Sequence, residues 1–173
     1  MIELKDARPG DIVLFKGKGL IFSILSSILW IFDKEWRSLK WKPWHTGFLT
    51  YKHGEYWELC ESLRQGIKLT NLTDYDPKTY RIYRWFKKEP ASDLILKYLG
   101  THLHKKYDIE FYFWCTLSYL FRHYFNRPIK YLLDNRFCCW ENIYHFASHC
   151  KKPIGCKYDC PLITDLCKSL DVK

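Results

Sequence analysis

Two runs of β-forming residues lie in the first half of the chain. Residues 8–15 read Arg-Pro-Gly-Asp-Ile-Val-Leu-Phe, where Pro-Gly marks a turn and the last four residues favour a buried strand. Residues 79–86, Thr-Tyr-Arg-Ile-Tyr-Arg-Trp-Phe, are also rich in strand-forming types. Each run therefore predicts one strand.

A hairpin is predicted between these two strands. Residues 44–61 contain two β-rich runs, separated by a turn signal at 52–54 that ends in a glycine. A turn centred there places His45 directly opposite Glu61 or Ser62, where cross-strand side chains lie within reach of each other. The sequence thus predicts an imidazole beside a carboxylate on one face of the hairpin.

Helical spacing of apolar residues returns in the second half. Residues 92–103 predict a helix that begins with a Ser92 cap. The aromatic-rich residues 111–125 predict a second helix, and residues 138–150 predict a third, capped by the pair Asp134-Asn135. The apolar stripe of this last helix consists of Trp140, Ile143, Tyr144 and Ala147.

The segment 19–32 differs from the others because it is apolar nearly all round and broken only by serines. As a helix it is too short to span a bilayer, which takes about 20 residues. It suits either a buried core helix or a helix lying against a membrane or an acyl chain. Lys16 and Lys18 before it and Lys34 after it fit an anionic membrane surface as partner.

Composition restricts the architecture. A chain of 173 residues, 47% of them hydrophobic, has the size of one domain and enough apolar surface for a core, which excludes wholesale disorder. Its 8 Gly and 7 Pro follow no short period, which excludes collagen-like and solenoid proteins. We expect a single α+β domain over residues 1–173, with a small antiparallel sheet or barrel packed against helices.

The charge balance favours anionic partners without identifying one. The 28 Lys and Arg residues exceed the 19 Asp and Glu residues, for a formal net charge of +9. The basic residues are scattered, and no helix-turn-helix or zinc-finger pattern surrounds them, so no specific nucleic-acid partner is expected. A solvated basic surface is the simpler interpretation.

The N-terminus lacks the layout of a secretion signal, so we expect a cytoplasmic protein with its eight cysteines mostly as thiols. Four of them lie close together but lack the paired CxxC spacing of a zinc site; these are Cys150, Cys156, Cys160 and Cys167. His145 and His149 share a helix face without an evident third ligand, so packing explains them better. No metal or cofactor is expected.

One cysteine has the surroundings of a nucleophile. Cys139 falls at the start of the last predicted helix, where unpaired backbone N–H groups favour an anion and hence a thiolate. A thiolate nucleophile also needs a proton acceptor and a group that orients it, and the hairpin supplies His45 and Glu61 for these tasks. The three residues together have the logic of a papain-like site.

Five sequence blocks, in this order, resemble the circularly permuted NlpC-type papain-like superfamily, with the bacterial YiiX/YebB group and its viral relatives as the nearest comparison. The blocks are Arg8-Pro-Gly-Asp-Ile-Val-Leu-Phe, Trp44-His-Thr-Gly-Phe-Leu, Glu61 followed by Gly66-Ile, Gly100 followed by Tyr107-Asp108, and Phe137-Cys-Cys-Trp-Glu141. They extend from about residue 7 to residue 147. The resemblance implies a permuted papain-like fold in which the histidine strand precedes the cysteine helix.

The same resemblance implies roles for single residues. The histidine of the family's H-x-G strand corresponds to His45, its nucleophilic cysteine to Cys139 and its acidic third member to Glu61. Two departures stand beside the cysteine, because the family has a small residue where this chain has Trp140, and Cys138 adds a neighbouring thiol. The spacing from Glu141 selects Cys139 as the nucleophile.

The expected function is that of a thiol hydrolase, a cysteine peptidase or amidase that passes through an acyl-enzyme on a peptide or acyl-bearing substrate. Two alternatives remain, a lipid-directed thioester acyltransferase or lipase, and a catalytically inactive binding or virion-associated module of the same fold. A viral origin would place the protein in the host cell or the virion. No oligomeric state follows from the sequence.

Overall fold

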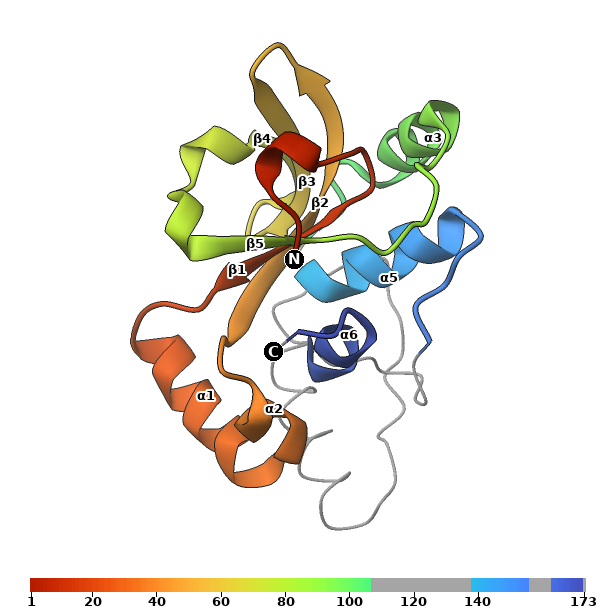
Figure 1. The fold of residues 1–173 in the computed structure, drawn as a ribbon. Coiled ribbons are helices and arrows are strands. Elements are labelled where there is room, and N and C mark those ends of the chain that lie inside the picture. The colour runs from red at the N-terminus through yellow and green to blue at the C-terminus, as the bar shows by residue number, and fades with distance from the viewer. Residues whose placement is uncertain (107–137, 156–162, 173) are drawn as a thin grey trace.

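The computed structural model describes residues 1–106, 138–155 and 163–172 (Figure 1). These residues form a five-stranded antiparallel sheet with helices packed against it, which confirms the predicted α+β class. The predicted helix over 111–125 lies outside the described residues.

The sheet has the strand order β4-β3-β2-β1-β5, so β2 is its central strand. Its strands are β1 (Ile12–Lys16), β2 (Pro43–His53), β3 (Tyr56–Leu63), β4 (Gly66–Asn71) and β5 (Tyr80–Tyr83). The strands predicted around 12–15, 44–51, 55–61 and 79–86 are confirmed, the last one shorter than expected. The edge strand β4 was not predicted.

The register of the β2–β3 hairpin differs from the prediction. The turn consists of Gly54 and Glu55, with a φ of 61° at Gly54, so the strands pair as His53↔Tyr56 at the turn. An irregularity between Leu49 and Lys52 shifts the pairing further along. Glu61 therefore stands opposite Gly47, and the predicted direct pairing of His45 with Glu61 or Ser62 is wrong.

The described residues form five α-helices beside the sheet: α1 (Leu20–Phe32), α2 (Lys34–Ser38), α3 (Ser92–His102), α5 (Cys139–His149) and α6 (Ile163–Ser169). Short 3-10 turns occupy Leu4–Asp6, Leu72–Asp74 and Pro77–Thr79. Both predicted caps are wrong, because Ala91 rather than Ser92 precedes α3, and Cys138 rather than Asp134 or Asn135 caps α5. The predicted helices over 92–103 and 138–150 are confirmed within one residue of each end.

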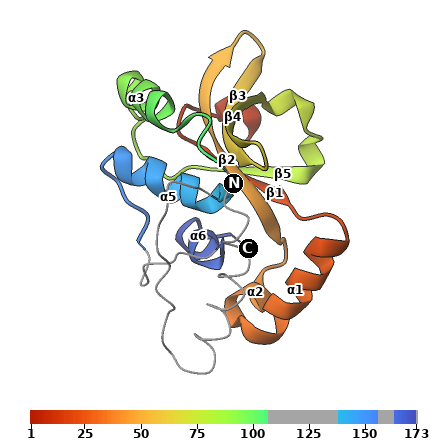
Figure 2. The ribbon, with the colours of Figure 1, turned by 180° about the vertical axis from the view of Figure 1, so that it is seen from behind.

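The main core lies between the sheet and α5. Phe48 of β2 stacks on Phe146 of α5, with ring centroids 3.7 Å apart, and Tyr98 of α3 meets both rings edge-on. Figure 2 shows α5 from behind, next to the sheet and between α3 and α6. This packing holds α5 against the central strand, and the first residues of the helix, Cys139 and Trp140, belong to the same core.

The Arg-Pro-Gly-Asp block at residues 8–11 is a structural device. Buried Asp11 accepts hydrogen bonds from the backbone N–H of Arg8 at 2.9 Å and from the guanidinium of Arg84 at 3.0 and 3.1 Å. These contacts tie the turn before β1 to the segment after β5. The block thus anchors the sheet and contributes no side chain to the candidate site.

The segment 19–32 forms a helix, as predicted, and its two sides differ. Leu29 is buried and Phe22 packs against the core, while Leu20, Ile24, Trp30 and Ile31 are exposed. Among the described residues no helix is both long and apolar enough to cross a membrane. Neither a fully buried helix nor a spanning one therefore fits α1.

Candidate functional site

His45 lies on the central strand β2. Its partner across the β1–β2 ladder is Phe15, whose ring centroid is 5.5 Å from that of the imidazole. The side chain keeps 23% of its surface exposed. One side of the ring is thus fixed by packing, and the ring still reaches the surface, where a substrate could approach.

Glu61 orients His45 from the neighbouring strand. The Nε2 atom of His45 lies 2.6 Å from Oε2 of Glu61, whose side chain is fully buried. The other carboxylate oxygen, Oε1, accepts hydrogen bonds from the hydroxyls of Thr70 at 2.5 Å and Tyr75 at 2.6 Å. Burial raises the pKa of Glu61, but its bonds to His45, Thr70 and Tyr75 outweigh burial and lower the pKa below the ordinary value.

Gly47 provides the space for this contact. It stands directly opposite Glu61, on the face of β2 that also carries His45. A Cβ atom at this position would lie 2.8 Å from the carbonyl oxygen of Cys60 and 3.1 Å from Cβ of Glu61. The glycine therefore allows the Glu61 side chain to lean diagonally along the ladder to His45.

Cys139 reaches the site from the other end of the sequence. It is the first residue of α5 and is buried, with Sγ 4.0 Å from the backbone carbonyl oxygen of Trp44. Its thiol lies close enough to His45 to raise the pKa of the imidazole.

The imidazole therefore lies between a thiol and a buried carboxylate. Burial lowers the pKa of His45, but the hydrogen bonds and negative charges of Cys139 and Glu61 outweigh it and raise the pKa to about 10. His45 is thus charged over the neutral range.

Cys138 is held in a different environment. Its backbone N–H donates to Oε2 of Glu141 at 3.0 Å, and its thiol accepts from the backbone N–H of Glu141, a capping box at the start of α5. Burial is the main reason why the pKa of the Cys138 thiol is well above its ordinary value. Cys138 is therefore a protonated capping residue, and Glu141 is a structural partner of the helix start.

The first turn of α5 also offers donors for a developing negative charge. Helix N-termini leave backbone N–H groups without intrahelical partners, and these groups bind anions.

The indole of Trp140 is 2% exposed and belongs to the main core. The bulky residue beside Cys139 is thus accommodated inside the protein.

The structure brings together the three predicted site residues, Cys139, His45 and Glu61. The sequence did not predict Thr70 and Tyr75, whose hydroxyls bond to Oε1 of Glu61, or the spatial role of Gly47. Thr70 lies on the unpredicted strand β4, and Tyr75 follows the 3-10 turn after it. The glycine two positions after His45 was a usable signal, because that spacing puts both residues on one face of a strand.

No protein-family model and no curated protein gives a significant match to this chain.

The other sequence candidates do not join this site. His149 packs against Tyr98 with ring centroids 5.6 Å apart, and His145 lies one turn before it on α5. Cys156 and Cys160 lie outside the described residues. The cysteines that the structure describes are free, and burial raises the pKa of Cys60 and of Cys167 to about 12.

Proposed function

We propose that the protein is a cysteine hydrolase with a permuted papain-like fold, a peptidase or amidase that cleaves amide bonds through an acyl-enzyme. The observation that carries this proposal is the position of His45, which is hydrogen-bonded to the buried carboxylate of Glu61 and lies beside the helix-start thiol of Cys139. Nucleophile, base and orienting group are the three parts that thiol acyl transfer requires.

The first half of the reaction forms a thioester. The Cys139 thiolate attacks the substrate carbonyl carbon, and the oxyanion is stabilised by backbone N–H groups at the start of α5, including that of Cys139. The His45 imidazolium then donates its proton to the leaving amine as the carbon–nitrogen bond breaks. The products of this step are a free amine, an acyl-enzyme and a neutral imidazole.

The second half returns the enzyme to its starting state. Neutral His45 takes a proton from water, whose oxygen attacks the thioester carbonyl. The carbon–sulfur bond breaks, the carboxylic acid leaves, and the thiolate–imidazolium pair forms again. Glu61 stays ionised throughout, because its three hydrogen-bond donors keep its pKa low, and it stabilises the charged ring in both halves.

One observation favours a second candidate, an acyl-ester hydrolase or acyltransferase that uses the same thioester. Phe22 of the apolar helix α1 packs edge-on against Trp44, the residue before His45, with ring centroids 5.3 Å apart. An acyl chain lying along α1 would thus be close to the nucleophile.

Thiol labelling with intact-mass analysis and peptide mapping tests the nucleophile. A limiting alkylating reagent should modify Cys139 first, and Cys138→Ala should keep that reactivity while Cys139→Ala removes it. First modification of Cys138 or Cys60 would overturn the assignment. Amide and ester acyl probes, run beside Cys139→Ala, then separate the two candidates, and no acyl-enzyme with either probe would contradict both.

A further inference from the structure

The exposed side of α1 is the one extended apolar stripe on a helix in the described part of the chain. Leu20, Ile24 and Ile31 recur at helical spacing and are 77%, 53% and 54% exposed, and Trp30 beside them is 56% exposed. The opposite side of α1 carries Leu29, which is buried. An apolar stripe of this kind on a helix at the edge of a protein marks an interaction surface.

The serines on this side do not make it polar. The hydroxyl of Ser23 donates to the carbonyl of Gly19 at 3.0 Å, and that of Ser27 donates to the carbonyl of Ser23 at 2.9 Å. These hydroxyls are therefore satisfied within the helix, so removing water from them costs little. Such a surface can enter an apolar environment.

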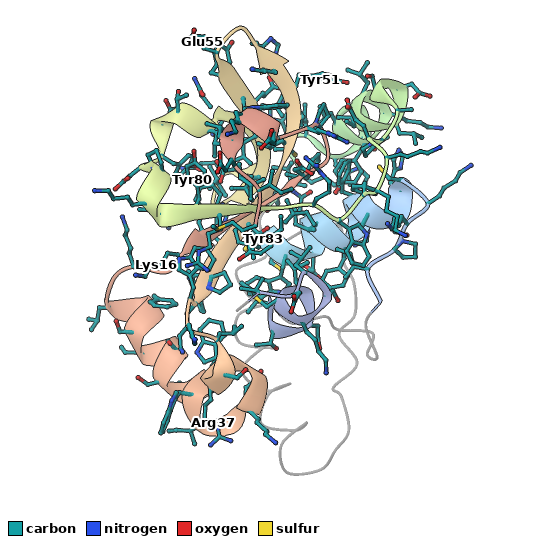
Figure 3. All side chains as sticks on the ribbon, viewed as in Figure 1. Lys16, Arg37, Tyr51, Glu55, Tyr80 and Tyr83 are labelled. Carbon is teal, nitrogen blue, oxygen red and sulfur yellow. The ribbon has the colours of Figure 1, made fainter. Side chains whose placement is uncertain are left out.

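Basic residues lie before and after α1 in the sequence. Residues 16–42 contain two acidic residues, Asp33 and Glu35, and six basic ones. The basic residues are Lys16, Lys18, Lys34, Arg37, Lys40 and Lys42. Lys16 and Arg37 lie at opposite ends of the α1–α2 unit (Figure 3). Asp33 is engaged internally, because its carboxylate accepts from the backbone N–H of Trp36 and from the hydroxyl of Thr164.

We propose that α1 is a docking surface for anionic phospholipid membranes. The stripe of Leu20, Ile24, Trp30 and Ile31 enters the headgroup region, and the basic residues before and after α1 contact lipid phosphates. The helix has 13 residues, so it lies along the membrane surface and does not span the bilayer. Figures 1 and 2 both show α1 at the outer edge of the molecule, away from α5 and α6.

Docking through α1 would place the candidate site at the membrane surface. The side of α1 that faces the protein contacts Trp44 through Phe22, and Trp44 precedes His45. The proposal does not depend on the proposed hydrolase activity, since membrane binding needs neither Cys139 nor His45.

Vesicle flotation of the full chain as Cys139→Ala tests the proposal without any reaction. We expect recovery with vesicles of phosphatidylcholine and phosphatidylglycerol, much less with phosphatidylcholine alone, and a decrease at high salt. Leu20→Glu combined with Ile24→Glu should lower the recovery about tenfold. The matched control is Leu96→Glu, which changes a leucine of α3 that is 59% exposed and should have no effect.

A second pair of variants keeps the test valid if the glutamates unfold the protein. Lys16→Gln with Lys34→Gln should weaken binding several-fold at low salt, whereas Lys87→Gln with Lys88→Gln, which removes the same charge from exposed positions outside α1 and α2, should weaken it less. Absence of flotation with anionic vesicles would overturn the proposal. A dimer in solution would also overturn it if Leu20→Glu combined with Ile24→Glu dissociated that dimer, because a second copy of the chain would then cover this side of α1.

Discussion

Glu61 stands opposite Gly47 in the β2–β3 ladder, yet its carboxylate bonds to His45, two residues further along β2. The contact is diagonal, and it exists because position 47 has no side chain. The absence of a side chain at Gly47 thus allows Glu61 to orient His45, the base of the candidate site.

Replacing this glycine should separate the two side chains. In Gly47→Ala, the added Cβ would meet the Cys60 carbonyl and Glu61, so we expect a loss of about 1–3 kcal/mol in the free energy of unfolding. Glu61 should shift and the reactivity of Cys139 should decrease. Urea unfolding and labelling rates measure both effects.

Gly100→Ala provides the control. A Cβ at Gly100, within α3, would meet nothing within 4 Å. Alanine is also the better helix former, so this variant should be as stable as the wild type or slightly more stable. Equal effects of the two substitutions would contradict the spatial role of Gly47.

Removing the negative charge of Glu61 should lower the pKa of His45. In Glu61→Gln, the imidazolium loses its buried counter-charge, so the alkaline limb of kcat/KM should move down from about pH 10 toward neutrality. Glu58→Gln is the matched control, since Glu58 lies on the opposite face of β3, where it contacts Thr50 and His53. A pH profile with an acyl probe measures the shift, and an unmoved alkaline limb would show that Glu61 does not set the charge of His45.

The His45–Glu61 pair should also make stability depend on pH. The pKa of His45 is raised from 6.5 to about 10, so its stabilising contribution is complete below pH 6.5 and is lost as the pH rises toward 10. The pKa of Glu61 is lowered from 4.5, so its contribution is complete above pH 4.5 and is lost at lower pH. The stability advantage of the wild type over His45→Asn should therefore be largest between these two ordinary values. Urea unfolding across the pH range measures this difference in stability. An advantage of the wild type that increases above pH 7 would contradict the prediction.

The hydroxyl of Tyr75 should act on the site through Glu61. In Tyr75→Phe, Oε1 of Glu61 loses one of its two hydroxyl donors, so the pKa of Glu61 should rise and the stability should fall by about 1–3 kcal/mol. We expect the acid limb of the activity profile to move to higher pH. Tyr80→Phe, which removes a hydroxyl from β5 that makes no bond to Glu61 in the described structure, should leave that limb in place.

The sequence predicted the strands and the helices of the site, because their apolar residues follow the periods of strand and helix. It did not predict the register, because the turn consists of Gly54 and Glu55 and is not centred near residue 53. An irregularity between Leu49 and Lys52 then shifts the pairing again. The strand β4 was missed because its residues from Lys68 onward are polar or partly exposed at a sheet edge. The cap of α5 was missed because Cys138 is an unusual capping residue, which only the bond to Glu141 identifies.

The order of the two halves of the site along the chain has a consequence for protein synthesis. A ribosome releases the β2–β3 hairpin with His45 and Glu61 long before it adds Cys139, and α5 can pack on the sheet only after that. The nascent polypeptide therefore carries His45 and Glu61 through the synthesis of the 77 residues that separate Glu61 from Cys139, before the sulfur of the candidate site is added.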